Sequence, residues 1–288
     1  MTRRLGIIGY PIAHSLSPAI FQAALGHYGL DISYEAWEIA PHELKGFVEE
    51  VRTPEAEVLG FNVTVPHKEM IMVYIDEVSP EAQKAVAVNT IFNQEGLLHG
   101  HNTDGAGFIR ALKEEAKFSF DGSRVLILGA GGAARGVVMA LASENLKSFT
   151  IANRTLDRCK RLARDLKRHW KGDLRSISLK ADDLRKAAQE ADLIVQCTTV
   201  GMLHGPDSDG ALLTAEDISP KALVYDLVYN PPETPFMKEA RRAGASVFGG
   251  LSMLVYQGAI GFEMWTGKEA PVEVMFKAAR KTLESSTT

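Results

Sequence analysis

The chain has 288 residues, 45% of them hydrophobic and 24% charged, and its formal net charge is −4. These values are typical of a soluble globular protein with one or two domains, and no stretch approaches the ~20 apolar residues of a membrane span. The slightly acidic balance gives no electrostatic reason to expect nucleic acid or an anionic membrane as a partner.

Apolar strands alternate with amphipathic helices from the start of the chain. Strands are expected at residues 5–9, 33–39 and 58–65. Helices are expected at residues 17–30, 41–52 and 104–116, the first with Ser17 as N-cap and Pro18 at the first helical position. A hairpin around "QEG" precedes the last of these helices. Strands that alternate with helices predict a parallel, doubly wound sheet.

A second α/β pattern begins near residue 120. It opens with "RVLIL", a strand of the kind buried on both faces, and continues with a glycine turn, a helix and a further strand. Later strands are expected at residues 192–199, 222–228 and 246–250. The segment 252–267 is apolar on nearly every side, which predicts a buried helix that returns to the first domain. We therefore predict two α/β domains, an N-terminal open-sheet domain (1–104 with 251–288) and a Rossmann-like domain (105–250).

The glycine turn has the pattern G-x-G-x-x-A, formed by Gly129, Gly131 and Ala134. A lone glycine pattern is weak evidence, but this one lies between a buried strand and a helix and is followed by a second strand. Gly129 would allow the tight turn, Gly131 would let the backbone approach a pyrophosphate, and Ala134 would permit close packing of the helix. The alternative is a tight turn without a ligand, and the strand–turn–helix context argues against it.

The second strand of this unit ends in Asn153, Arg154 and Thr155. NAD enzymes keep an acidic residue here for the ribose 2′-hydroxyl. A guanidinium instead matches a phosphate in charge and in bidentate geometry. The sequence therefore favours NADP over NAD, against the alternative that Arg154 is an ordinary solvated arginine.

Eight motifs, taken together and in order, resemble those of the shikimate dehydrogenase family from Gly9 to Gln257. They are "GYPIAHSLSP", "FNVTVPHK", "AVNTI", "GHNTDG", "GAGGAARG", "NRT", "DLVYNP" and "GLSMLVYQG". The resemblance implies two α/β domains with a substrate cleft between them. It also implies reversible reduction of 3-dehydroshikimate to shikimate with NADPH, a step of chorismate and aromatic amino acid biosynthesis.

The resemblance further implies a role for each matching residue. Lys68 and Asp104 match the catalytic pair. Ser15 and Ser17 match the residues that hold the substrate carboxylate. Thr64 and Asn89 match contacts to ring hydroxyls, and Tyr229 and Gln257 match further substrate contacts. The cofactor contacts match Gly129, Ala130, Gly131, Gly132, Ala133, Asn153, Arg154, Thr155, Leu227 and Gly250.

The residue types agree with a small polyhydroxylated carboxylate as substrate, because such a ligand needs hydroxyl and amide partners for its oxygens. Asn62 and Asn102 belong to the same polar inventory. Taken singly, each residue has a structural alternative: Ser17 as an N-cap, Gln257 as a core glutamine, Asp104 as the N-cap of the helix that follows it. Taken together, at the carboxyl ends of strands in an α/β sheet, they favour a polar ligand site.

Lys68 lies in the first turn of a predicted helix, next to the positive end of the helix dipole. This position is unfavourable for a structural lysine. It suits a lysine that gives a proton to a ketone oxygen, with Asp104 to favour and orient the ammonium group. The alternative is a solvated surface lysine.

Two other functions remain open at this point. An NAD-preferring quinate/shikimate dehydrogenase would share most motifs, and Arg154 argues against it. A non-catalytic dinucleotide-binding regulator would lack Lys68 or Asp104, and both are present. The short apolar run at the N-terminus and the lack of any disulfide or metal-type cysteine spacing predict a cytoplasmic protein without a metal. We expect a small-molecule substrate and a monomer or homodimer.

Overall fold

The structure is a computed structural model that describes residues 3–180, 182–203 and 205–286. The chain forms two compact units, one made of residues 1–107 with 254–288 and the other of residues 108–253. Each unit contains one six-stranded sheet with helices against it, which confirms the predicted α/β class. None of the helices in the described ranges is long and apolar enough to cross a bilayer.

The first unit is built on a mixed sheet with the strand order β2-β1-β3-β5-β6-β4. Its strands are β1 (Arg3–Gly9), β2 (Ile32–Glu38), β3 (Val58–Val63), β4 (Glu77–Val78), β5 (Thr90–Gln94) and β6 (Leu97–His101). β1 runs parallel to β2 and β3, whereas β5 is antiparallel to both β3 and β6. The predicted parallel strands are β1, β2 and β3, and the predicted hairpin, formed by β5 and β6, extends the same sheet with β5 antiparallel to β3.

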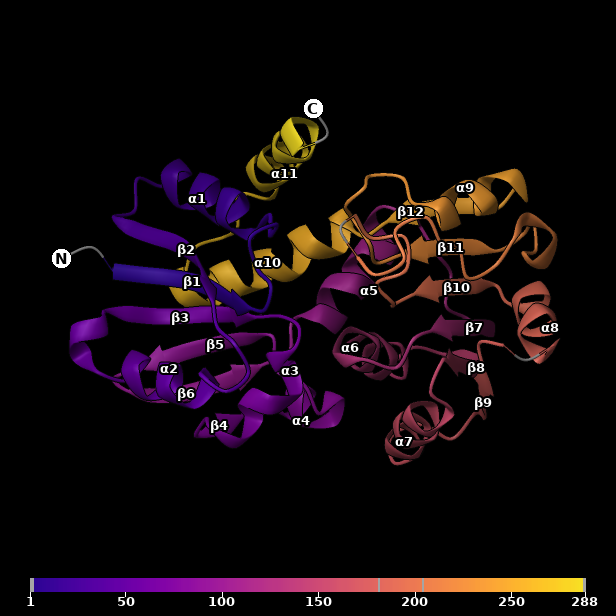
Figure 1. Ribbon diagram of the computed structural model, residues 1–288, viewed down its shortest axis with the longest axis horizontal. Helices are drawn as coiled ribbons and strands as arrows, with labels where there is room; N and C mark the ends of the chain where they lie inside the picture. The colour runs from indigo at the N-terminus through magenta and orange to yellow at the C-terminus, as the bar shows by residue number, and fades with distance from the viewer. Residues whose placement is uncertain (1–2, 181, 204, 287–288) are drawn as a thin grey trace. The chain divides into compact units, whose positions relative to one another are not determined.

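Helices cover both faces of this sheet (Figure 1). They are α1 (Ser17–His27), α2 (Leu44–Val51), α3 (His67–Met70), α4 (Pro80–Ala85), the start of α5 (Asp104–Glu114), most of α10 (Leu251–Thr266), and α11 (Val272–Ser286), with short 3₁₀ turns at Pro54–Ala56 and Ile71–Val73. Side chains of α2 pack with β3 and β6 in one apolar core. On the other face, Trp265 of α10 donates a hydrogen bond from Nε1 to the Ile91 carbonyl (2.9 Å).

The second unit is built on a fully parallel sheet with the strand order β12-β11-β10-β7-β8-β9. Its strands are β7 (Ser123–Leu128), β8 (Leu146–Asn153), β9 (Asp173–Ser178), β10 (Leu193–Gln196), β11 (Leu223–Asp226) and β12 (Ser246–Gly249). The order reverses between β7 and β10, as in the doubly wound dinucleotide-binding fold. Ligands of such sheets bind outside the carboxyl ends of the strands at this switch point.

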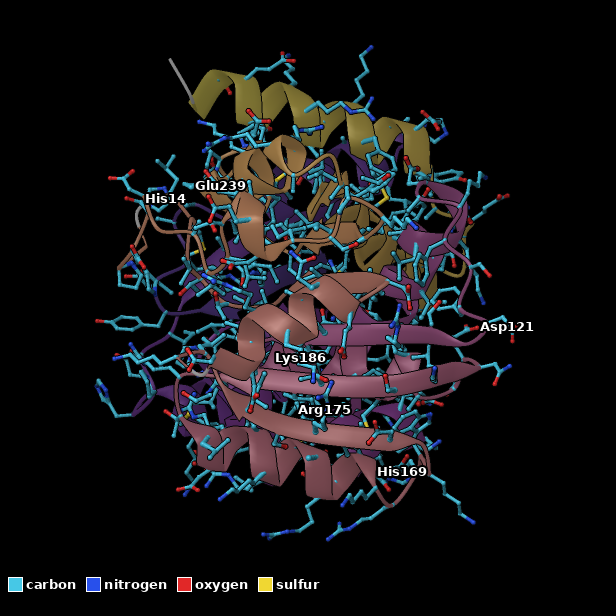
Figure 2. All side chains as sticks on the ribbon, turned by 90° about the vertical axis from the view of Figure 1, so that its right-hand side faces the viewer. His14, Asp121, His169, Arg175, Lys186 and Glu239 are labelled. Atoms are coloured by element: carbon cyan, nitrogen blue, oxygen red, sulfur yellow. The ribbon has the colours of Figure 1, made fainter. Side chains whose placement is uncertain are left out.

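The helices of this unit are the greater part of α5 (residues 108–114), α6 (Gly132–Leu141), α7 (Leu156–Leu166), α8 (Asp182–Glu190) and α9 (Pro235–Arg242), with a 3₁₀ turn at Ala215–Asp217. Residues of α8 and α9 share one apolar core with alternate residues of β7, β10 and β11. In Figure 2, Lys186 lies on α8 in front of the sheet, Arg175 on β9, and His169 beyond the end of α7. α6 and α7 contact each other on the opposite face of the sheet (Figure 1).

The first helix begins one residue earlier than the sequence suggested. Leu16 occupies the N-cap position without a side-chain hydrogen bond, so the prediction of Ser17 as N-cap is wrong. Ser17 instead lies inside the helix with a buried side chain. Its hydroxyl is therefore not used for capping, which leaves it for contacts elsewhere.

Candidate active site

Lys68 and Asp104 form an ion pair in the first unit, although 36 residues separate them in the sequence. Lys68 Nζ lies 2.5 Å from Asp104 Oδ2, and the two side chains are 13% and 6% exposed. Lys68 extends from α3 and Asp104 from the first residue of α5. Since both groups are largely removed from water, the attraction between them is weakly screened and fixes the ammonium group in place.

The helix that carries Lys68 is only one turn long and continues as a 3₁₀ turn. So short a helix sums few peptide dipoles, so the unfavourable effect of the helix dipole on Lys68 that the sequence predicted is small. The position of Lys68 is instead fixed by its backbone, because the Val88 N–H donates to the Lys68 carbonyl (2.8 Å). The neighbouring His67 is fully buried and hydrogen-bonded to the Ile39 carbonyl (2.7 Å).

Asn89 is the centre of the polar cluster around this pair. Its Nδ2 group donates to Asp104 Oδ1 (2.9 Å), Thr103 Oγ1 (2.9 Å) and Gln257 Oε1 (3.2 Å). Its Oδ1 accepts a hydrogen bond from the Thr103 backbone N–H (2.8 Å). Asp104 thus receives hydrogen bonds from two sides, and its carboxylate is held toward Lys68 rather than serving as an N-cap.

A second chain of hydrogen bonds connects Asn62 and Ser17 to this cluster. Asn62 donates to the Asn89 carbonyl and to Thr90 Oγ1 (both 3.1 Å), and it accepts a hydrogen bond from the Tyr34 hydroxyl (2.7 Å). Burial raises the pKa of Tyr34, and a hydrogen bond with the Ser17 side chain acts in the opposite direction. Tyr34 therefore lies between two of the predicted substrate residues.

The other predicted substrate residues are placed differently. Thr64 is partly exposed and lies against Gly9, where a Cβ would come within 2.6 Å of Thr64 Cγ2. Ser15 accepts a hydrogen bond from the Ser17 N–H (3.3 Å). Asn102 is bonded to the Ala87 carbonyl (2.9 Å). Tyr229, by contrast, belongs to the second unit, within the loop after β11.

The glycine turn between β7 and α6 has the geometry of a phosphate loop. Gly129 adopts φ +120°, a conformation that L side chains rarely adopt, and Ala134 is fully buried in α6. Gly131 is the N-cap of α6 without a side-chain hydrogen bond, and a Cβ there would meet nothing within 4 Å. Open space and uncapped amides at the helix N-terminus fit a pyrophosphate, with Ala130, Gly132 and Ala133 beside it.

Arg154 directly follows β8, at the same edge of the sheet as the glycine turn. Arg154 is exposed, and none of the described residues forms an ion pair with it. Asn153 is tied back by a hydrogen bond from Nδ2 to the Thr155 carbonyl (3.1 Å), and Thr155 is the N-cap of α7. This arrangement leaves the guanidinium available for an anionic group.

Leu227 and Gly250 meet at the carboxyl ends of β11 and β12. A Cβ on Gly250 would overlap the Leu227 carbonyl oxygen, so only glycine fits there. The Gly250 N–H also donates to the Val228 carbonyl (3.2 Å). The two positions, both predicted as cofactor contacts, therefore lie in direct backbone contact with each other.

The same loop is anchored by Asp226, a fully buried carboxyl group that the motif analysis did not assign. Its Oδ1 accepts a hydrogen bond from the Val228 N–H (2.9 Å) and its Oδ2 one from the Thr234 hydroxyl (2.6 Å). Burial raises the pKa of Asp226 to about 6, although both hydrogen bonds act in the opposite direction. Asp226 thus holds the loop that carries Leu227 and Tyr229.

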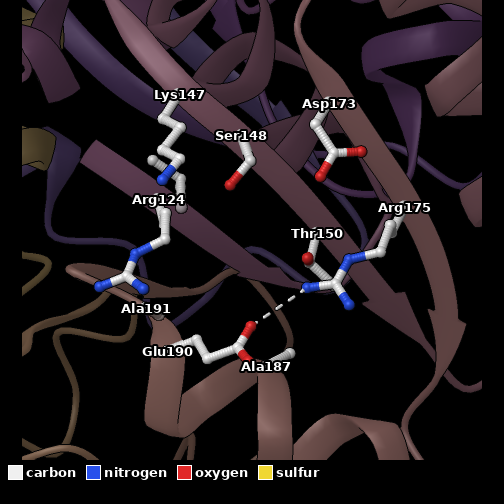
Figure 3. Close-up of a pocket in the computed structure, with 10 residues that line it drawn as sticks. Arg124, Lys147, Ser148, Thr150, Asp173, Arg175, Ala187, Glu190 and Ala191 are labelled. Atoms are coloured by element: carbon white, nitrogen blue, oxygen red, sulfur yellow. Dashed lines mark ion pairs between the residues drawn. The ribbon is translucent and has the colours of Figure 1, made fainter. Parts of the chain in front are cut away.

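A separate cavity of about 300 Å³ lies at the amino ends of β7, β8 and β9 (Figure 3). Two of its cations have partners of opposite charge: Arg175 lies 3.7 Å from Glu190, and Arg124 is paired with Asp192 (3.1 Å). The cavity lies at the opposite edge of the sheet from the glycine turn.

Three residues of the polar cluster were not among those predicted from the sequence: Tyr34, Thr90 and Thr103. Thr90 and Thr103 lie inside the quoted motifs "AVNTI" and "GHNTDG", directly after Asn89 and before Asp104. Tyr34 gives no such signal, because a buried aromatic residue in a strand looks like an ordinary core residue.

Three family models match the chain in order. A model described as "Shikimate dehydrogenase substrate binding domain" matches residues 7–91, and one described as "Shikimate / quinate 5-dehydrogenase" matches residues 111–204. A third, described as "Shikimate 5'-dehydrogenase C-terminal domain", matches residues 250–280. The matches fall on both units.

Known proteins resemble the chain over nearly its whole length. A protein named shikimate dehydrogenase (NADP(+)) from Methanopyrus kandleri is 46% identical over 98% of this chain and 96% of its own. The structure of shikimate 5-dehydrogenase from Thermus thermophilus with NADP(H) and shikimate is 41% identical, has a TM-score of 0.86 and covers 98% of this chain and 100% of that one. Quinate dehydrogenase from Corynebacterium glutamicum with NAD is 27% identical, has a TM-score of 0.87 and covers 97% and 99%.

Proposed function

Because this chain belongs to the shikimate dehydrogenase family, we propose that it reduces 3-dehydroshikimate to shikimate reversibly with NADPH. The matches to family models and to full-length relatives confirm the family predicted from the motifs. The observation that carries the proposal is the buried Lys68–Asp104 pair, which Asn89 holds in place from its other side. NADP-dependent relatives support the choice of cofactor.

The reduction of a ketone adds a hydride to carbon and a proton to oxygen. When bound, the dinucleotide supplies the hydride. Lys68 carries ammonium protons that can be given to the developing alkoxide, and Asp104 accepts a hydrogen bond from that ammonium and so fixes its direction. In the oxidation of shikimate, the same lysine starts as the neutral amine that the forward proton transfer leaves, and it takes the hydroxyl proton to become the ammonium group again. Lys68 is thus the proposed general acid and base, and Asp104 its orienting partner.

The polar residues around this pair suit a cyclic substrate that has hydroxyl groups and a carboxylate. We assign Ser15 and Ser17 to the carboxylate, and Thr64, Asn89 and Gln257 to the hydroxyl groups. Asn62 and Tyr34 support Ser17 and Asn89 through the hydrogen bonds described above. Tyr229 is proposed as a substrate contact from the second unit. A site built from such matched partners rejects an analogue that lacks one hydroxyl group.

We assign the phosphates of the dinucleotide to the turn Gly129–Ala133 and its adenosine end to Asn153, Arg154 and Thr155. Arg154→Asp is expected to weaken NADPH binding roughly 10–150-fold before repulsion is added, because a charge-assisted hydrogen bond contributes about 1.5–3 kcal/mol. NADH binding should hold or improve. Titration of both nucleotides by fluorescence measures the two constants, and equal losses for NADPH and NADH would contradict this assignment of Arg154.

The activity is tested by the oxidation of NADPH with 3-dehydroshikimate, followed at the absorbance of the nicotinamide. The same assay with NADH, and the reverse reaction with quinate, decide between the proposal and an NAD-preferring quinate/shikimate dehydrogenase. A much higher rate with NADH and quinate would establish the second function. We propose that the enzyme works in the cytoplasm as a monomer or homodimer, which light scattering of the purified protein distinguishes.

A further inference from the structure

Positive charge is concentrated in one short segment of the second unit, residues 154–171. The segment contains eight lysines and arginines and two aspartates, a formal charge of +6. Because the whole chain carries −4, the remaining residues together carry −10. The charge is thus distributed very unevenly along the chain, although the net charge is small.

Most of this charge lies on the solvent side of α7. The helix buries Cys159, Leu162, Ala163 and Leu166 against the sheet. Lys160, Arg164 and Lys167 are exposed and follow each other at four- and three-residue spacing, which places them along one face. Among the described residues, no ion pair neutralises any of these three. The face therefore projects an unbalanced positive potential.

Helix stability explains only part of this pattern. Cations in the last turn are favoured by the helix dipole, and this accounts for Arg164 and Lys167. It does not account for Lys160, which lies in the middle of the helix. One exposed carboxylate, Asp157, precedes Lys160 by one turn on this face. None lies between Lys160 and Lys167 along it, whereas carboxylates would be expected there on a helix held by i,i+4 ion pairs.

The basic face of α7 begins at the proposed cofactor site. α7 starts at Leu156, directly after the residues Asn153–Thr155. At ~1.5 Å per residue, Lys167 lies roughly 17 Å along the helix axis from that start. The whole face is therefore within one Debye length of the site at about 10 mM salt, where that length is ~30 Å, and largely beyond it at about 0.1 M, where it is ~10 Å.

We propose that the exposed face of α7, formed by Lys160, Arg164 and Lys167, steers NADPH toward its site without contacting the bound cofactor. The inference rests on the proposed function. The 2′-phosphate adds a charge of about −1.5 to −2 to the dinucleotide, so the face attracts NADPH more strongly than NADH. A long polyanion is a poorer fit, because it would also meet the rest of the chain with its charge of −10. Residues 160–167 thus favour NADP by the rate of association, in addition to the contact made by Arg154.

The test replaces the three cations together with glutamine (Lys160→Gln, Arg164→Gln, Lys167→Gln), which keeps helix propensity nearly constant. Stopped-flow fluorescence gives the association and dissociation rates of NADPH without any substrate, so the result does not depend on activity toward 3-dehydroshikimate. At about 10 mM salt, we expect association to slow by about 3–10-fold and dissociation to stay within about twofold. In about 0.3 M salt the difference should nearly vanish.

Two controls make the result specific. Lys186→Gln, Lys221→Gln and Lys238→Gln together remove the same charge from exposed positions of the same unit that lie outside α7, and should leave association nearly unchanged. The association of NADH should slow only by about the square root of the factor seen for NADPH, since the charge of NADH is about half as large. An equal loss in the control protein would show that total charge sets the rate, and faster dissociation would show direct contact. Either result overturns the proposal.

Discussion

Replacing Lys68 with alanine is expected to lower kcat by about 10²–10⁴-fold, the usual contribution of a positioned general acid or base. NADPH binding should change little, because the proposed cofactor residues lie on the second unit. Substrate binding should weaken modestly, since the serines and Asn89 remain. Steady-state kinetics with 3-dehydroshikimate and nucleotide titration separate these effects. Lys84→Ala, a change of an exposed lysine on α4, is the matched control and should leave kcat unchanged.

The same substitution should also destabilise the protein, because it leaves the buried Asp104 carboxylate without its counter-ion. Removing one partner of a buried pair typically costs about 3–5 kcal/mol. Asp104→Asn in the Lys68→Ala background should recover part of the stability and none of the activity. A stable Lys68→Ala protein with nearly normal kcat would show that Lys68 is not the general acid and base.

The buried Asp226 should make the second unit less stable as the pH rises from about 4 to about 6. The pKa of this carboxyl is raised from 3.8 to about 6, so over that interval the folded state binds a proton that the unfolded state has lost. The stabilisation is fully present below pH 3.8 and is lost as the pH passes through about 6. A shift of about two pKa units corresponds to about 3 kcal/mol.

Asp226→Asn removes the titrating group and keeps its shape, so the difference between the two proteins isolates this effect. The measurement is the free energy of opening of the second unit, followed by hydrogen exchange of the β10 and β11 peptides across the pH range. The wild-type protein should lose about 3 kcal/mol relative to the variant between about pH 4 and 7. Parallel curves for the two proteins would show that Asp226 does not titrate in this range.

The local parts of this fold and site could be predicted from the sequence. The turn at Gly129 and Gly131 was recognised because its signals are adjacent: a buried strand, glycines that need particular backbone angles, and a helix. Arg154 was recognised by its distance from that turn. The pair of Lys68 and Asp104 came from a resemblance rather than from spacing, since nothing local connects two residues 36 positions apart.

The parts that could not be predicted depend on contacts between distant segments. The antiparallel place of β5 beside β3 is decided by pairing across the sheet, whereas the alternation of strands and helices suggests only parallel neighbours. Ser17 looked like an N-cap because the residue type and Pro18 fit, yet the helix begins from Leu16. Tyr34 belongs to the polar cluster through the hydrogen bond from its hydroxyl to Asn62, a contact between segments 28 residues apart that the sequence does not reveal.

The division of the chain at Gly107 and Leu254 determines the order in which the two units can fold during synthesis on the ribosome. The second unit is one continuous stretch and can fold as soon as it has emerged. The first unit waits for Gln257, which bonds to Asn89, and for Trp265, which bonds to Ile91. At about 5–20 residues per second, synthesis of the intervening 146 residues delays α10 by roughly 7–30 s. During that interval the face of the first sheet that α10 later covers remains open to chaperones, so a nascent chain truncated before Leu251 should be held by them while its second half is already folded.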